Sequence, residues 1–473
     1  MFDVTNLVVG AIIGADIYVA SSFGAGYLGP LSLLVWVAAG IIAIVIALCF
    51  AQCAAYVPKV GGSYAYVKAV GGSFAGFMVG WSLWLAEWIS LAVFPVAFVR
   101  YLMFFAPDLT MPQQVAVKIL FVAFLAVSNI IGVKSAGRVN DLLTIVKLAP
   151  LIFFSVVGLA IITLNPALTQ ANFTPFAPFG FSNFGAALIL IFWAYAGFEL
   201  STIPADEIKD STRTIPRAIV LGIAIVTVFY LVTNLVLFGV RSWKLLATDS
   251  APLAAANSAM LSFVPGLALL GGLIVSVGAL VSVAGSDESA MIGTSRLGYA
   301  LALDGLFPRQ FAEVHKRFKT PYLGIIIQSV TALAAAILGT LGGLIATSVL
   351  FLSIAYFGTC VSIYFFRKRL PKPKFVLRGG LAIPVMGAIF SLYLLSQCSL
   401  EQFEIGAALL ALGVIVYWRF SPGEELKEIR EAYLSQDSVL ERLYDQEERF
   451  LAHLLRHIKR LYRRLTGKEQ AWS

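Results

Sequence analysis

Long apolar runs separated by short polar connections make up most of the chain. Runs of about 20 apolar residues match the length that a helix needs to cross a bilayer. The pattern therefore predicts an all-α polytopic membrane protein with about twelve transmembrane helices. The predicted spans are residues 4–26, 30–56, 74–105, 113–132, 139–163, 184–204, 215–239, 266–302, 321–339, 343–366, 379–397 and 403–419.

The polar pattern changes near residue 421, where the apolar runs stop. The segments E-E-L-K-E-I-R-E-A-Y-L and F-L-A-H-L-L-R-H-I-K-R-L-Y-R-R-L have the pattern of amphipathic helices, the second with basic residues on its polar face. We therefore divide the chain into a transmembrane domain, residues 1–420, and a cytoplasmic amphipathic tail, residues 421–473. The tail either lies on anionic lipid headgroups, forms a cytoplasmic helical pair, or mediates self-association as a homodimer.

Composition supports a membrane protein, since 59% of the residues are hydrophobic and 13% are charged. The net charge of +8 does not indicate a nucleic-acid partner, because the basic residues lie mainly in short loops and in the tail. The first apolar run starts near Val4 without a basic segment before it, so we expect a retained first span rather than a signal peptide.

Lysine and arginine are distributed unequally between the two sets of loops. With the N-terminus placed inside, the outside loops hold little beyond Lys118, Arg241 and Lys244. This asymmetry predicts a multi-pass protein of the plasma membrane with both termini in the cytoplasm. The basic residues of the inside loops are Lys59, Lys68, Lys134, Arg138, Lys209, Arg213, Arg217, Arg309, Lys316, Arg317, Lys319 and the run Arg367 to Arg378.

The cysteines and histidines do not form a metal-binding pattern. All four cysteines fall inside apolar runs, and all three histidines lie in polar segments outside the predicted spans. The sequence also lacks a nucleotide-binding loop and a Ser/His/Asp constellation. We therefore expect no metal, no cofactor and no enzymatic activity.

Two predicted spans carry glycine followed by an acid. The first contains Gly10, Gly14 and Asp16, and the sixth contains Ala196-Gly197 followed by Glu199. At 1.5 Å per residue, each acid lies roughly 20 Å from one end of its span, near the bilayer midplane. Such matched interruptions predict discontinuous helices 1 and 6 in an inverted repeat of spans 1–5 against 6–10. The alternative is ordinary close packing of small residues between helices.

Further ionisable and hydroxyl groups lie at membrane depth in other spans. Glu87 follows Trp84 in the third span and meets either a substrate cation, a proton or a partner within the bundle. Lys147, roughly 12 Å into the fifth span, is a candidate proton-exchanging amine or a substitute for bound sodium. Its candidate partners, Ser282, Ser286 and Asp287, lie in the eighth span. The alternatives are a snorkelling lysine and a structural pair near the inner surface.

Four segments together carry a resemblance to a known family. They are V-G-A-I-I-G-A-D-I-Y, P-K-V-G-G-S-Y-A-Y-V, F-W-A-Y-A-G-F-E followed by D-E-I-K-D-S-T-R-T-I-P-R, and S-R-L-G-Y-A-L-A-L-D-G-L-F-P. On these segments, and over essentially all twelve predicted spans, the chain resembles amino acid permeases of the amino acid–polyamine–organocation superfamily. The resemblance implies a leucine-transporter-like fold of five plus five helices and alternating access.

The resemblance also implies roles for individual residues. The first-span backbone would contact the ammonium and carboxylate of a substrate, and Trp193 would cover the substrate. The sixth-span backbone would add further contacts, Glu199 would respond to protons, and the Lys147 amine would occupy the sodium position of sodium-coupled relatives. The backbone residues so implied are Ile12, Ile13, Gly14, Ala15 and Asp16 in the first span and Ala194, Tyr195, Ala196 and Gly197 in the sixth.

Asp16 departs from the family pattern, which usually has glycine at this position. A carboxylate there repels a substrate carboxylate by about 1 kcal/mol or more at close range unless it is protonated. The sequence thus predicts a proton-coupled secondary active transporter of amino acids or related organic cations. The alternatives are an amino acid or amine exchanger, a polyamine transporter, and a membrane sensor that signals through the tail.

Overall fold

A computed structural model describes residues 2–59, 61–132, 136–202, 208, 210–262, 267–373, 375–376 and 379–421. The chain forms two compact units, Met1–Phe420 and Ser421–Ser473. The predicted amphipathic tail lies almost entirely outside the described residues and stays a prediction.

The described residues fold into helices and contain no β-strand. Because apolar side chains cover these segments, a helix is the structure that satisfies every backbone hydrogen bond within one chain segment in lipid. The α-helices are α1 (Phe2–Ile12), α2 (Asp16–Leu28), α3 (Ser32–Tyr56), α4 (Ser63–Leu102), α5 (Met111–Ile131), α6 (Ala136–Leu164), α7 (Pro166–Asn172), α8 (Phe184–Phe192), α9 (Ser211–Val240), α10 (Trp243–Leu246), α11 (Pro252–Met260), α12 (Leu267–Leu303), α13 (Tyr322–Leu338), α14 (Leu341–Arg369), α15 (Ala382–Ser396) and α16 (Leu400–Phe420). The 3-10 helices are η1 (Gly29–Leu31), η2 (Trp193–Tyr195), η3 (Phe198–Thr202) and η5 (Arg309–Ala312).

Nine stretches of the described residues are long and apolar enough to cross a membrane. The longest, Val4–Tyr56, includes α2 and α3 and is too long for one crossing, while α13 and α15 are shorter apolar helices. A multi-pass helical membrane protein is thus confirmed, whereas the count of twelve spans and the five-plus-five repeat stay predictions.

The structure interrupts the first and sixth predicted spans at the expected glycines. The chain leaves the helix at Ile13–Ala15, between α1 and α2. In the sixth span, α8 and η2 end before Ala196, and η3 starts after Gly197. Gly197 has a φ of +113°, in the left-handed region that favours glycine. Both interruptions leave backbone amides and carbonyls outside a regular helix.

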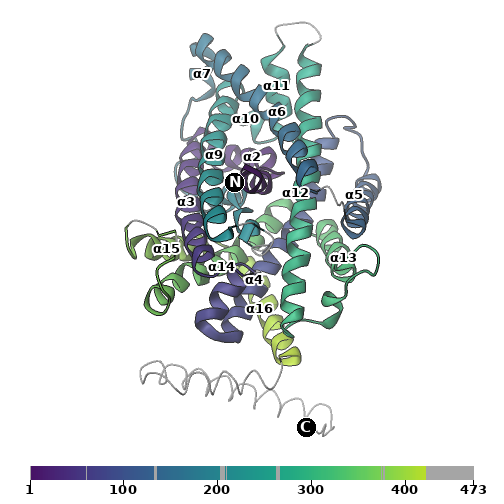
Figure 1. Cartoon of the computed structure of the whole chain (residues 1–473). Coiled ribbons are helices and arrows are strands. Elements are labelled where there is room, and N and C mark those ends of the chain that lie inside the picture. Colours follow the sequence, from purple (N-terminus) through teal and green to yellow (C-terminus); the bar gives the residue numbers. More distant parts are fainter. Residues whose placement is uncertain are drawn as a thin grey trace, which may run out of the picture. The chain divides into compact units, whose positions relative to one another are not determined.

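The interrupted segments lie inside a bundle of long helices. Segment α1 packs against α9, α6 and η3, and α8 packs against α2, α3 and α14. Outside this group, α4 packs along both α14 and α12, and α3 packs along α9. In Figure 1, α2 lies in the middle of the bundle, while α5 with α13 and α15 with α3 flank it on opposite sides.

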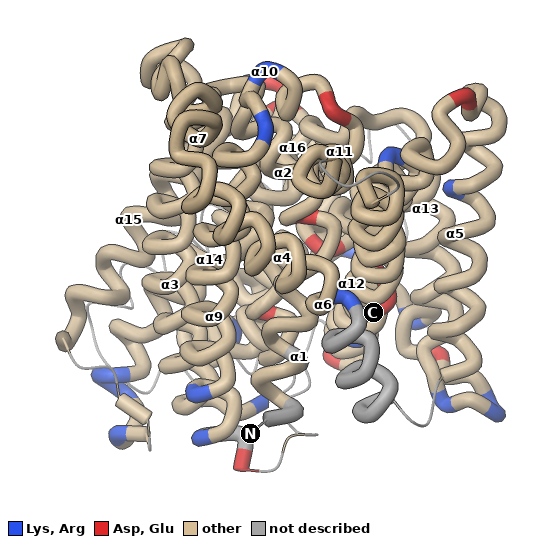
Figure 2. The backbone as a smooth tube through the Cα atoms, turned by 90° about the horizontal axis from the view of Figure 1, so that it is seen from above, with Lys and Arg blue, Asp and Glu red and all other residues tan. Residues whose placement is uncertain are grey.

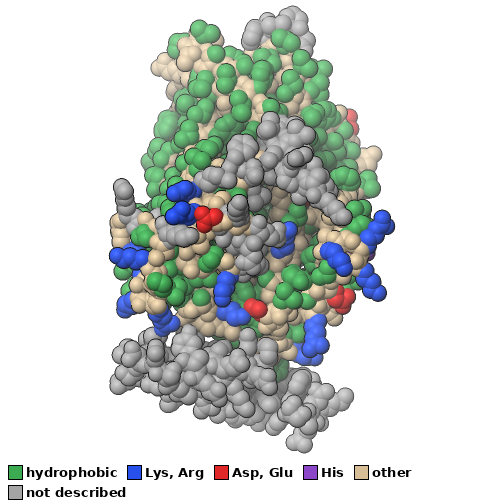
Figure 3. Space-filling view, viewed as in Figure 1, with side chains coloured by type: hydrophobic (Ala, Val, Ile, Leu, Met, Phe, Trp, Pro, Cys, Tyr) green, Lys and Arg blue, Asp and Glu red, His purple; other side chains and the backbone are tan. Residues whose placement is uncertain are grey.

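The surface of the transmembrane unit separates apolar and basic side chains. Hydrophobic side chains cover the upper part of the face in Figure 3, and lysine and arginine gather toward its lower part. Acidic positions occur at the surface and also inside the bundle, where tan helices surround them in Figure 2. A charge inside an apolar bundle is costly, so acids in the interior indicate a candidate functional site there.

The structure adds details that the span pattern does not contain. Segment α4 begins at Ser63, before the predicted third span, and changes direction at Gly72, where φ is +79°. The eighth span continues as one helix to Leu303, so residues 290–302 extend it rather than starting a separate element. The short helices α7, α10 and α11 lie in predicted loops. Their 7, 4 and 9 residues are too few to cross a bilayer, so they add no span.

Candidate functional site

A small cavity of about 40 Å³ lies where the two interrupted helices meet. Its walls come from five predicted spans, the first, third, sixth, eighth and tenth, which makes it a meeting point of the bundle. The lining residues are Ala11, Ile12, Gly14 and Asp16 of the first span, Glu87, Ser90 and Phe94 of α4, Trp193, Ala196, Gly197 and Leu200 of the sixth, Ser286 and Ala290 of α12, and Leu352 of α14.

Two glycines allow the interrupted helices to approach each other and α12. A Cβ atom added to Gly197 would lie 2.7 Å from the carbonyl oxygen of Ala11. A Cβ atom added to Gly14 would lie 2.7 Å from the Ser286 hydroxyl. Contacts below 3.0 Å are essentially absent for real Cβ atoms. The cavity therefore depends on glycine at both interruptions.

Asp16 starts α2 and turns its carboxylate back toward the first interruption. Its Oδ1 accepts a hydrogen bond from the Gly14 amide at 2.6 Å, and its Oδ2 accepts one from the Tyr230 hydroxyl at 2.5 Å. The Tyr230 hydroxyl also lies 3.3 Å from the carbonyl oxygen of Ile12. A carboxylate at a helix N-terminus is favoured by the free amides and by the helix dipole. Asp16 is therefore held by the protein itself.

Lys147 lies at the opposite side of the same interruption, beside the C-terminal end of α1. Its Nζ donates to the Gly10 carbonyl at 2.5 Å and lies 3.5 Å from the Ser286 hydroxyl. Ser286 in turn donates to the Ile13 carbonyl at 3.2 Å, and Ser282 donates to the Gly14 carbonyl at 3.4 Å. The last carbonyls of a helix have no partner within it and attract cations. Here the Lys147 ammonium group and the Ser286 and Ser282 hydroxyls donate hydrogen bonds to the carbonyls at this interruption.

Glu87 and Glu199 bring two more carboxyl groups to the cavity. Glu87 lines it, and Glu199 is fully buried next to Glu87, where the two side chains interact electrostatically. Among the described residues, no group makes a normal hydrogen bond to either Glu199 oxygen, although Tyr356 and the Gly197 amide are close. Two carboxyl groups that share a buried site do not both ionise unless a nearby cation balances their charge. Otherwise one of them keeps its proton.

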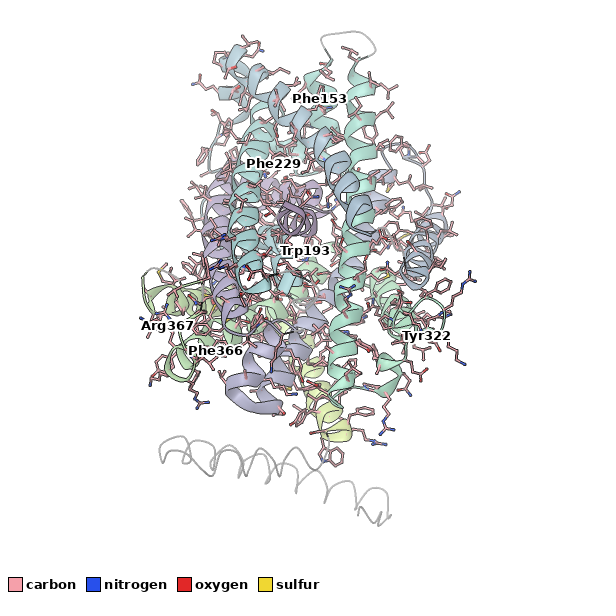
Figure 4. All side chains as sticks on the ribbon, in the orientation of Figure 1. Phe153, Trp193, Phe229, Tyr322, Phe366 and Arg367 are labelled. Atoms are coloured by element: carbon pink, nitrogen blue, oxygen red, sulfur yellow. The ribbon has the colours of Figure 1, made fainter. Side chains whose placement is uncertain are left out.

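Trp193 closes one side of the cavity. Its indole Nε1 donates to the Ser90 hydroxyl at 3.1 Å, and its ring packs against Phe94 with ring centroids 5.9 Å apart. Ser90 also hydrogen-bonds Ser348 of α14 at 3.0 Å. Figure 4 shows Trp193 in the middle of the bundle. These contacts hold the indole across the space between α4, α14 and the sixth span.

A second, larger cavity of about 290 Å³ lies near the ends of α3 and α14. Tyr56, Lys59, Phe366 and Arg369 are among its lining residues, and no residue of the interrupted helices is. In Figure 4, Phe366 lies near the edge of the bundle, away from Trp193. The smaller cavity is therefore the better candidate site, because the unpaired backbone groups and the buried acids converge on it.

The predicted site residues fall into two groups in the structure. Seven of the predicted substrate-binding residues and one predicted coupling residue line the cavity, and the others do not. The lining group is Ile12, Gly14, Asp16, Glu87, Trp193, Ala196 and Gly197, to which Ser286 adds an eighth residue from the coupling set. Those that do not line it are Ile13, Ala15, Ala194, Tyr195, Glu199, Lys147, Ser282 and Asp287.

The side chains of Tyr195 and Asp287 lie outside the cavity lining, and the backbone contact predicted for Tyr195 stays a prediction. Tyr195 packs its ring on Trp36 and Tyr230 and donates to the Trp36 carbonyl at 3.0 Å, so it belongs to the packing behind the site. Asp287 is buried, but Lys147 contacts Ser286 rather than Asp287. Adjacent helical residues point about 100° apart, so the face of α12 that brings Ser286 to Lys147 turns Asp287 to a different side.

Several residues near the cavity were not predicted. Ser90 and Phe94 lie three and seven positions after Glu87, a helical spacing that indicates a shared face. This helical spacing from Glu87 is the sequence signal by which both residues could have been predicted. Tyr230 and Leu352 lie in apolar spans without a distinguishing pattern, so no local signal marks them as neighbours of Asp16 or of the cavity.

Comparisons with known proteins agree with this architecture. A family model described as amino acid permease matches residues 1–418. The chain is 27% identical to the methylthioribose transporter of Bacillus subtilis (strain 168), with 89% of this chain and 92% of that protein covered. It is 26% identical to the branched-chain amino acid permease BcaP of the same organism, with the same coverage of 89% and 92%.

A third relative is the serine/threonine exchanger SteT of Bacillus subtilis (strain 168), which is 28% identical over 77% of this chain and 82% of that protein. These relatives are named for different substrates, so the match establishes the family and leaves the substrate open. The resemblance seen in the four sequence segments is confirmed. The chain belongs to the amino acid permease family and is a membrane transport protein rather than an enzyme.

Proposed function

We propose that the protein is a secondary active transporter that carries amino acids or related organic amines across the cell membrane by alternating access. The observation that supports this most is the contact between two interrupted helices around a buried cavity, with Gly197 against the Ala11 carbonyl. Free backbone groups at membrane depth are tolerated where they line a cavity or meet a ligand. The family of the relatives is consistent with this function.

We further propose that transport is coupled to protons through Lys147. Its ammonium group bonds the Gly10 carbonyl and contacts Ser286, which bonds the Ile13 carbonyl. Loss of the proton from Lys147 would weaken the charge-assisted bond to α1 and free this helix to move. A proton would thereby control the position of one wall of the cavity. The Glu87–Glu199 pair is a second proton-accepting position in the same wall region.

The orientation with both termini in the cytoplasm belongs to the same proposal. Exposed basic residues such as Lys316, Arg317, Lys368 and Arg369 occupy predicted inside loops. Lysine and arginine are enriched in the cytoplasmic loops of membrane proteins. We place the protein in the plasma membrane as part of the same proposal.

Exchange is the second candidate, since one relative is named an exchanger. The two mechanisms differ in what drives accumulation. In proteoliposomes, a proton-coupled transporter accumulates labelled substrate when an inward proton gradient is applied to empty vesicles. An exchanger takes up label only when the vesicles contain unlabelled substrate. Uptake that is the same with and without the proton gradient, and that requires internal substrate, would refute proton coupling.

A further inference from the structure

We propose that the substrate is an aliphatic amine that lacks a carboxylate group, an inference that rests on the transport function proposed above. It names the chemical class of the ligand in the cavity between the interrupted helices.

The backbone amide best placed to receive a substrate carboxylate is already occupied. The Gly14 amide, at the N-terminal end of α2, donates to the Asp16 carboxylate at 2.6 Å, and the Tyr230 hydroxyl donates to the other oxygen at 2.5 Å. A helix N-terminus with free amides is an anion site. Here the protein's own side chain takes that place. A substrate carboxylate would have to displace Asp16 or approach it against electrostatic repulsion.

The second interruption also has an acid near its glycine, without the hydrogen bond that holds Asp16. Glu199 follows Gly197 by two positions, as Asp16 follows Gly14, and the Gly197 amide is close to the Glu199 carboxylate. Both Glu199 oxygens are buried and, among the described residues, make no normal hydrogen bond. The first interruption therefore has its amide occupied by Asp16, and the second has the Glu199 carboxyl close to its own glycine amide.

The charge around the cavity also favours a cation. Among the described residues that line it, two carry carboxyl groups, Asp16 and Glu87, and none carries a positive charge. Glu199 lies behind Glu87, and the nearby Lys147 ammonium bonds the Gly10 carbonyl. Because Glu87 and Glu199 share one buried site and do not both ionise, Asp16 and one glutamate face the Lys147 ammonium. This leaves one excess negative charge, which a cationic ligand neutralises. A zwitterionic amino acid, with no net charge, does not.

The remaining wall suits the hydrocarbon part of an amine. Ile12, Phe94, Trp193 and Leu352 line the cavity with apolar surface. Trp193 and Phe94 are aromatic, and the face of an aromatic ring attracts an ammonium group as well as alkyl carbons. A cation at the carboxyl groups and an alkyl chain along these side chains together describe an aliphatic amine.

Matched compounds that differ by one carboxylate test the proposal directly. The full-length protein is purified, and its thermal unfolding is measured with lysine against cadaverine, arginine against agmatine, and leucine against isoamylamine. A ligand that binds the folded state raises the unfolding temperature. We expect the amine of at least one pair to stabilise the protein at a concentration at least tenfold below that required for the matching amino acid. Uptake of the labelled amine into proteoliposomes should follow the same preference.

Two variants locate the effect. Asp16→Gly frees the Gly14 amide and removes the repulsion, so the preference should move toward the amino acid of the pair by tenfold or more. The matched control, Asp108→Asn, removes an exposed acid that does not line the cavity and should leave the preference unchanged. The comparison in the wild-type protein decides the proposal even if Asp16→Gly does not fold.

The failures of the two proposals are distinguishable. Binding and uptake of amino acids with no response to the amines would overturn the inference and leave the transport function standing. An Asp16→Gly protein with the wild-type preference would overturn the role assigned to Asp16 in excluding a carboxylate. A folded wild-type protein that transports no member of any pair would overturn the transport proposal itself.

Discussion

Lys147 and Lys118 are two lysines of apolar helices that each donate to a backbone carbonyl. Lys147 bonds Gly10 at the end of α1, whereas Lys118 bonds Ala336 at 2.8 Å, away from the cavity. A shared kind of hydrogen bond thus occurs in two different settings. If proton coupling depends on the contact with α1, alanine at position 147 and alanine at position 118 should affect transport differently.

We expect Lys147→Ala to lose proton-driven accumulation by tenfold or more, because no titrating group would then link the proton to α1. Exchange of substrate between the two sides should persist. The measurement is uptake into proteoliposomes with and without an inward proton gradient. Lys118→Ala is the control and should retain coupling. A Lys147→Ala protein that still concentrates substrate under the gradient would show that the coupling lies elsewhere.

Two buried tyrosines allow a similar comparison for Asp16. Tyr230 donates to the Asp16 carboxylate, and Tyr195 donates to the Trp36 backbone carbonyl. Hydrogen bonds to charged groups contribute roughly 1.5–3 kcal/mol and neutral ones about 0.5–1.5 kcal/mol. We therefore expect Tyr230→Phe to lower the free energy of unfolding more than Tyr195→Phe does. Thermal unfolding of both purified variants measures this. Equal losses would indicate that Asp16 is protonated and accepts only a neutral hydrogen bond.

At the scale of helices, the pattern of glycine followed by an acid was enough to predict both interruptions. Gly14 with Asp16 and Gly197 with Glu199 combine a residue that weakens a helix with one that is costly in lipid, and both signals are local. The partners of these residues could not be predicted in this way. Tyr230 lies 214 positions from Asp16, and the packing of α9 against α1 brings them together. Long-range packing leaves no local pattern in an apolar span.

The contact between the interrupted helices leads to a prediction about Gly197. Its φ of +113° and the added Cβ contact of 2.7 Å with the Ala11 carbonyl combine backbone strain with a clash against backbone. Strained backbone conformations cost about 1–3 kcal/mol each. We expect Gly197→Ala to lower the unfolding temperature and to reduce uptake. Gly180→Ala is the control, since Gly180 also has a positive φ, +62°, but an added Cβ there meets nothing within 4 Å.

Comparable destabilisation by the two substitutions would mean that backbone strain alone accounts for the effect. A larger loss in Gly197→Ala would assign the difference to the approach of the first and sixth spans together with the φ of +113°, which L residues adopt less readily than +62°. The comparison therefore measures how much the protein depends on glycine at this contact.

For the whole transmembrane unit, orientation is the property that the distribution of charge predicts. Lys316, before α13, and Lys244, in α10, are both exposed and lie in loops assigned to opposite sides of the membrane. All four native cysteines are buried, so the wild-type protein provides a low background for thiol labelling. We expect an impermeant thiol reagent added to intact cells to label Lys244→Cys and to leave Lys316→Cys unlabelled. The reverse result would invert the orientation.

The division of the chain into two units allows the last prediction, which separates transport from signalling. The cavity, both interrupted helices and every contact described around them lie within Met1–Phe420. A transporter needs these parts, whereas a sensor needs an output element, for which residues 422–473 are the candidate. We expect a chain ending at Ser421 to keep uptake within about twofold of the full-length protein, corresponding to roughly 0.4 kcal/mol. Uptake into proteoliposomes, normalised to the amount of inserted protein, is the measurement. Loss of uptake in a truncated protein that inserts and unfolds at the normal temperature would make the tail part of the transport cycle, because the cavity itself would still be complete.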